Sequence, residues 1–155
     1  MIRLADDKIS VKAADAINDH EVAESQVCIY GKKVKEKLYG LVLEECYLYQ
    51  GRYLLFLTDD IPHEDILHIY YLDSDLNVLD RADIGSPYAT GSFRSSVVVA
   101  DNIISFNFIG NTVWTLTLFT SERNRIPFIS DPTGVTRKLS FYCYFQLDGK
   151  PCPEN

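Results

Sequence analysis

Short runs of β-branched and aromatic residues recur from residue 25 to residue 147, and turn residues separate them. These side chains suit a pleated, half-buried surface, and frequent short runs of this kind are typical of antiparallel strands. The clearest run is 112–120, where Trp114, Leu116 and Leu118 alternate with other side chains and so share one face of a sheet. No stretch has helical spacing long enough for the crossover that a parallel sheet requires.

The whole pattern predicts about nine strands joined by short connections. We expect them at 26–30, 38–49, 52–58, 66–72, 76–83, 92–99, 103–108, 112–120 and 138–147. Two-residue hairpin turns are indicated at Gln50–Gly51 and Gly110–Asn111. A meander of this kind closes into a barrel or splits into a sandwich. We therefore predict an all-β, or β-dominated α+β, fold: an antiparallel meander that forms a sandwich or barrel of about nine strands.

The N-terminal segment differs from this pattern. Ser10 is a good helix-capping residue, and the alanines and Ile17 that follow favour a short helix over 11–18. The sequence from Lys8 to Lys12 is equally compatible with a strand. We predict the helix.

The chain has 155 residues, which suits a single domain. We predict one globular domain over 1–155, in which 1–24 forms a possible helical N-terminal segment. The tail 148–155 is polar and rich in proline, so we expect it to be loose.

The N-terminal sequence and the spacing of the cysteines predict the cellular location. Two aspartates occur by position 7, so the basic and then apolar pattern of a secretory signal is not seen. No run approaches the roughly 18 apolar residues of a membrane span. The four cysteines form no C-x-x-C pair and are interpreted mainly as buried, reduced thiols. We expect a cytoplasmic protein with no membrane partner.

No motif indicates catalysis or metal binding. His63 and His68 are five residues apart rather than four, and on a strand that separation puts them on opposite faces. The aspartates from Asp73 onward resemble an EF-hand loop, but Val78 occupies the position that needs glycine. A hairpin turn explains them better. We predict no catalytic residue, no metal ligand and no cofactor, and we expect that the protein is not an enzyme.

The distribution of charge along the sequence is the remaining feature that bears on function. The net charge is −7, from 22 acidic and 15 basic residues. The segment 59–83 contains eight acidic residues against Arg81 alone, so it accounts for the entire net charge. A negative balance argues against binding to a phosphate backbone, so we expect no nucleic-acid partner.

Two basic stretches lie outside the acidic segment. The first contains Lys32, Lys33, Lys35 and Lys37. Its alternation with Val34 and Glu36 fits the solvent face of an edge strand, where lysine opposes edge-to-edge pairing; binding to RNA or an acidic peptide is the alternative. The second, looser stretch contains Arg123, Arg125, Arg137 and Lys138.

The acidic segment has two interpretations. It is either a solvated surface that aids solubility or a face that meets a basic partner, because concentrated charge speeds association and rejects wrong partners. Nearby tyrosines would add contact area. The candidate partner-binding residues are Asp59, Asp60, Glu64, Asp65, Tyr70, Asp73, Asp75 and Asp80.

These observations favour a non-catalytic protein-binding module. A small acidic chain without a catalytic motif fits the general type of immunity or antitoxin proteins, which neutralise a basic toxin such as a nuclease by direct binding. This is an inference about class, since no motif specifies that group. The alternative is a β-barrel or sandwich that holds a small apolar ligand in a cavity lined by Tyr and Phe.

Overall fold

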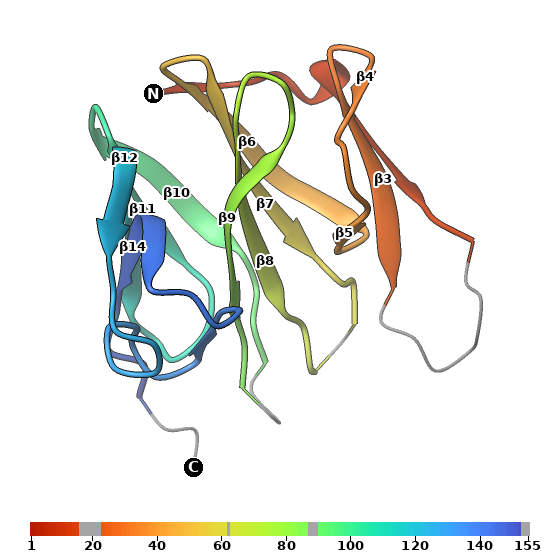
Figure 1. Ribbon diagram of the computed structural model, residues 1–155. Coiled ribbons are helices and arrows are strands. Elements are labelled where there is room, and N and C mark those ends of the chain that lie inside the picture. The colour runs from red at the N-terminus through yellow and green to blue at the C-terminus, as the bar shows by residue number, and fades with distance from the viewer. Residues whose placement is uncertain (16–22, 62, 87–89, 153–155) are drawn as a thin grey trace.

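The computed structural model describes residues 1–15, 23–61, 63–86 and 90–152, and these form fourteen strands in three antiparallel sheets (Figure 1). The central sheet has the order β1 (Ile2–Arg3), β6 (Val42–Tyr49), β7 (Arg52–Thr58), β8 (Leu67–Leu72), β9 (Val78–Ile84) and β13 (Val135–Thr136). The C-terminal sheet has the order β10 (Arg94–Ala100), β11 (Ile103–Asn107), β12 (Val113–Asn124) and β14 (Tyr142–Asp148). The N-terminal sheet contains β2 (Ile9–Ala13), β3 (Glu24–Ile29), β4 (Lys32–Lys33) and β5 (Leu38–Tyr39).

The three sheets are stacked as layers, with the central sheet between the other two (Figure 1). One apolar core, the C-side core, joins the central and C-terminal sheets and includes Phe56, Phe106 and Trp114. The other, the N-side core, joins the central and N-terminal sheets and includes Val27 and Leu55. The central sheet therefore buries apolar side chains on both faces.

Strand β8 shows how the sequence allows this arrangement. Leu67, Ile69 and Tyr71 belong to the C-side core, whereas Tyr70 and Leu72 belong to the N-side core. All six residues of the strand are buried. A continuous apolar run is what a strand needs when both of its faces are covered, because successive side chains point to opposite faces.

The prediction of a strand-dominated antiparallel fold is confirmed. Each of the nine predicted runs overlaps a strand, and the two-residue hairpin turn at Gln50–Gly51 is present between the paired residues Tyr49 and Arg52. Gly110 and Asn111 do lie in the β11–β12 turn with positive φ, but that turn spans the five residues 108–112, because Asn107 pairs with Val113. The run 38–49 is split into β5 and β6 at Gly40, whose φ of 105° and close approach to Leu57 exclude a side chain. The barrel alternative is wrong, because the sheets stay open and stack instead.

The prediction of a helix over 11–18 is wrong for its described part. Strand β2 pairs residue by residue with β3, from Ile9 opposite Ile29 to Ala13 opposite Ser25. Ile9 is buried in the N-side core, so tertiary pairing outweighs the helix propensity of the alanines. The rest of that prediction, at 16–18, lies outside the described residues.

The structure describes the predicted tail, 148–155, as far as Cys152. Strand β14 extends to Asp148, and the Cys152 amide donates a hydrogen bond to the Gly110 carbonyl, at 2.9 Å. The last three residues of the predicted loose tail lie outside the described residues.

Candidate functional site

The predicted acidic residues do not share one surface. Asp59, Asp60, Glu64 and Asp65 lie in the loop between β7 and β8, and Asp73 and Asp75 lie in the β8–β9 turn, at the other end of β8 (Figure 1). Asp80 lies within β9 and Tyr70 within β8. The structure therefore brings four of the eight residues together, in the loop that precedes β8.

Burial removes two of the eight candidate partner-binding residues from the surface. Tyr70 is 2% exposed and Asp59 is 6% exposed, so neither supplies the surface contact that the sequence suggested. Asp60, Glu64 and Asp75 are exposed. Asp73 accepts hydrogen bonds from the Asp75 and Asn77 amides and shapes the turn, as predicted.

Asp59 instead belongs to a buried charge network with His68, a residue that sequence reasoning left as an ordinary strand histidine. The His68 Nε2 lies 2.8 Å from Asp59, and its Nδ1 lies 2.7 Å from Asp83. Arg81 donates to the other Asp83 oxygen at 2.8 Å. This network lies beside the N-side core, at the end of β8 where the 59–66 loop enters.

The two carboxylates keep His68 charged. Burial alone would lower its pKa, but the hydrogen bonds and charges of Asp59 and Asp83 raise the pKa of His68 to about 9. Burial also opposes ionisation of Asp83, yet His68 and Arg81 hold the pKa of that carboxyl below its ordinary value. Both ring nitrogens are engaged, so His68 has no free nitrogen for acid–base chemistry.

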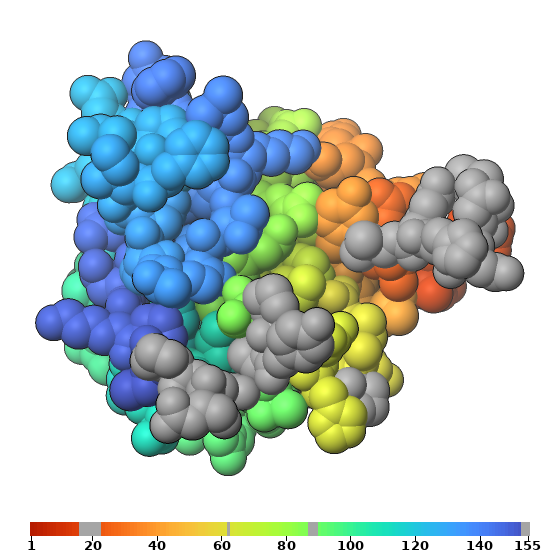
Figure 2. Space-filling model, turned by 90° about the horizontal axis from the view of Figure 1, so that it is seen from below, coloured from red at the N-terminus to blue at the C-terminus, as the bar shows by residue number. Residues whose placement is uncertain are grey.

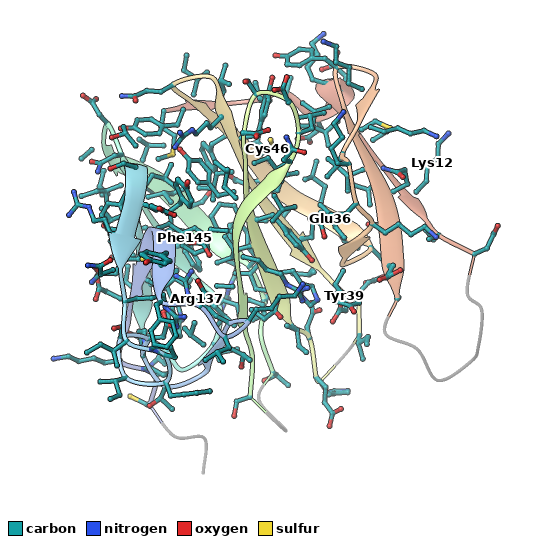
Figure 3. All side chains as sticks on the ribbon, viewed as in Figure 1. Lys12, Glu36, Tyr39, Cys46, Arg137 and Phe145 are labelled. Carbon is teal, nitrogen blue, oxygen red and sulfur yellow. The ribbon has the colours of Figure 1, made fainter. Side chains whose placement is uncertain are left out.

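A second network fastens the connection between β12 and β14 to the central sheet. Arg137 donates to Asp80 at 2.9 Å, to Asp131 at 3.0 Å and to the Phe145 carbonyl at 2.9 Å. Its guanidinium also lies over the Phe145 ring (Figure 3). Arg125 pairs with the second oxygen of Asp131. Asp80, predicted as a surface residue for a partner, is thus a structural link between two sheets.

Six large exposed apolar side chains gather on this same connection and at the start of β14. They are Ile126, Phe128, Ile129, Leu139, Phe141 and Tyr142, which we call the 126–142 apolar surface. Phe128 is 89% exposed and Ile129 is 75% exposed. The two halves of the surface adjoin, because the Arg125 amide donates to the Phe141 carbonyl at 2.8 Å and Phe128 and Leu139 line one hollow. Exposed apolar clusters of this kind mark interaction sites.

The backbone holds Phe128 outward at a cost. Its φ is 66°, a left-handed conformation that is rare for a bulky residue and costs about 1–3 kcal/mol. The surrounding loop fixes it: the Ile129 and Ser130 amides donate to the Ile126 carbonyl, and the Ile126 amide donates to Ser130 Oγ at 2.8 Å. Seven other non-glycine residues among those described also have a positive φ, Tyr30 among them, so it is the 89% exposure of its ring that sets Phe128 apart.

Sequence reasoning missed this surface because it was drawn to charge. The signal lies in the segment between the predicted strands 112–120 and 138–147. Its sequence carries Ile126, Phe128 and Ile129 between Pro127 and Pro132, where apolar residues have no strand to pack into.

Two further tests bear on the described part of the chain. None of its helices is both long and apolar enough to cross a membrane. Among the same residues, no group of three or more His, Cys, Asp or Glu side chains is arranged to hold a metal ion.

Comparisons with known proteins identify no relative of this chain. No protein-family model matches the sequence, and searches of curated proteins and of solved structures return no significant match. The functional argument therefore rests on the geometry of this chain.

Proposed function

We propose that this protein is a non-catalytic protein-binding module and that the 126–142 apolar surface is its main contact. The observation that carries the proposal is the exposure of six large apolar side chains, five on the connection between β12 and β14 and one at the start of β14. Aromatic residues are enriched at protein interfaces and provide most of the anchors there. Valines are also exposed on the edge strand β10, but that region has no aromatic ring.

The charge of the chain supports a basic partner. The acidic loop that holds Asp60 and Glu64 (yellow) and the 121–130 segment (light blue) both appear on the face shown in Figure 2. A partner seated on this face would meet apolar contacts and carboxylates together. Exposed charges at the edge of an interface act mainly on the rate of association and on specificity.

Within this proposal, we keep the particular kind of partner expected from the sequence. The protein would be an immunity or antitoxin type, located in the cytoplasm, that neutralises a basic toxin such as a nuclease by covering its surface. Asp59 and Asp80 are engaged internally, and Asp75 lies at the other end of β8. The charges that would meet this partner are therefore those of Asp60 and Glu64. The rival function, binding of a small apolar ligand, gains no support, since the Phe rings of the C-side core pack against one another at 5.3 Å between centroids.

The proposal is tested by capturing partners from the source cell with purified protein. We expect one basic protein to be retained in a fixed ratio by the wild type and lost with Phe128→Ser/Phe141→Ser. Both side chains are exposed, so these changes should leave stability within about 0.5 kcal/mol.

The matched control is Tyr30→Ser/Ile2→Ser, which removes two exposed apolar side chains elsewhere on the molecule. It should capture as the wild type does. Retention of the partner by the Phe128 and Phe141 variant, or equal loss with both variants, would contradict the proposed surface. A captured partner that is acidic would contradict the immunity type.

A further inference from the structure

A groove of about 240 Å³ runs beside β9, and three separate parts of the chain form it. Residues 36–37 provide one wall, 137–142 provide the other, and β9 with Tyr70 lies between them. Figure 3 shows Glu36 and Arg137 on opposite sides of β9. A water molecule takes about 30 Å³ of liquid, so the groove has room for a small hydrated ligand.

The groove is lined by cations, although the chain as a whole is acidic. Its basic lining residues are Lys37, Arg81, Arg125, Arg137 and Lys138, and its acidic ones are Glu36 and Asp80. Arg125 and Arg137 are neutralised by Asp131 and Asp80. Within the described residues, neither Lys37 nor Lys138 has a carboxylate at ion-pair distance.

Arg81 is held in place with most of its donors unused. Its guanidinium lies over the Tyr39 ring at 4.5 Å and over the Tyr70 ring at 5.4 Å. Among the described residues its only ion pair is with Asp83, although a guanidinium has five N–H donors in a rigid fork. An arginine fixed by stacking loses little entropy when it binds an anion.

We propose that this groove binds a small oxyanion of the phosphate class, held by Arg81, Lys37 and Lys138. This site adjoins the 126–142 apolar surface, since Tyr142 lines the groove and belongs to that surface. Arg81, Arg125 and Arg137 are paired with carboxylates of the chain, whereas Lys37 and Lys138 reach the groove from different segments without an ion pair to any described residue and would both attract an anion placed between them. Cations on two walls and the floor suit a group with a charge near −2 and oxygens in several directions, rather than a flat carboxylate with a charge of −1.

The net charge limits the size of the ligand. At −7, the chain repels a long polyanion such as nucleic acid. A compact anion places its whole charge inside the groove, where the local cations outweigh that repulsion. The ligand is therefore a free phosphate or a single phosphate group.

The test is a titration of the full chain with inorganic phosphate at constant ionic strength and near neutral pH, followed by amide NMR. We expect saturable shifts confined to residues around the groove. Lys37→Gln/Lys138→Gln should weaken binding by about a hundredfold or more, since the loss of each charged contact costs about tenfold or more. Both lysines are exposed, so the fold should be retained.

The matched control is Lys32→Gln/Lys33→Gln, which removes the same charge from β4 outside the groove. It should bind phosphate within about twofold of the wild type, because distant exposed charges are screened. Three results would overturn the proposal: no saturable shifts, equal weakening in both double variants, or binding of acetate as tight as that of phosphate.

Discussion

His68 shows how one buried residue depends on its neighbours. It is 3% exposed, and a charged imidazole in that position would be costly without partners on both nitrogens. Asp59, in the loop between β7 and β8, and Asp83, in β9, provide these partners. The sequence order alone could not reveal this, because Asp59 and Asp83 lie 24 positions apart. A histidine inside a strand with two apolar faces was nevertheless a signal that partners were required.

This network makes stability depend on pH. The pKa of His68 rises from 6.5 to about 9 on folding, so the folded protein holds a proton that the unfolded chain releases. The stabilisation is complete below pH 6.5 and is lost as pH rises through about 9. We expect the free energy of unfolding to fall by on the order of 3 kcal/mol over this range.

The measurement is urea unfolding at several pH values for the wild type and His68→Gln. The variant cannot bind the proton, so its stability should change much less over the same range. A wild-type stability that stays constant or rises with pH would rule out a charged, carboxylate-bound His68.

At the scale of elements, the connection between β12 and β14 is placed by charge rather than by apolar burial. Arg137 and Asp131 come from the connection, whereas Asp80 comes from β9. Asp80 also accepts hydrogen bonds from the Tyr144 and Phe145 amides of β14. Val135 of the connection still packs against the C-side core, whereas the side chains of the 126–142 apolar surface remain exposed.

We predict that Arg137→Met lowers the free energy of unfolding by about 3–5 kcal/mol, because it removes one partner of a buried charge network. Lys138→Met, the exposed neighbour, should change it by less than about 0.5 kcal/mol. Urea unfolding measures both. The double variant Arg137→Met/Asp80→Asn should lose less stability than the sum of the losses in the two single variants, as expected for coupled residues. An Arg137→Met effect as small as that of Lys138→Met would show that the network does not hold the connection.

The strands were predictable because their signal is local. Alternation, apolar runs and turn residues identify a strand without knowledge of its neighbours, which is why β7, β8 and β12 were located within a few residues. Strand β2 was mistaken for a helix because its identity depends on pairing with β3, on the far side of an intervening segment. The two-residue strands β1 and β13 exist only as partners of longer strands and have no signal of their own.

At the scale of the whole molecule, the stacking of three sheets decides which residues remain at the surface. Both faces of the central sheet are buried, so its charged residues Asp80 and Asp83 form ion pairs within the protein and are not available to a partner. Charge counted along the sequence therefore overstated the acidic surface between 59 and 83. The side chains of the 126–142 apolar surface, which look like core material in the sequence, stay exposed.

The central claim is that Phe128 lies at the centre of an interface with another protein. The most direct test replaces Phe128 with a photo-cross-linking phenylalanine analogue and irradiates the protein in its source cell. Tyr30, an exposed aromatic residue between β3 and β4, is the control position. We predict one dominant cross-linked protein from position 128 and none from position 30. No cross-linked protein from position 128, or the same products from both positions, would contradict the claim.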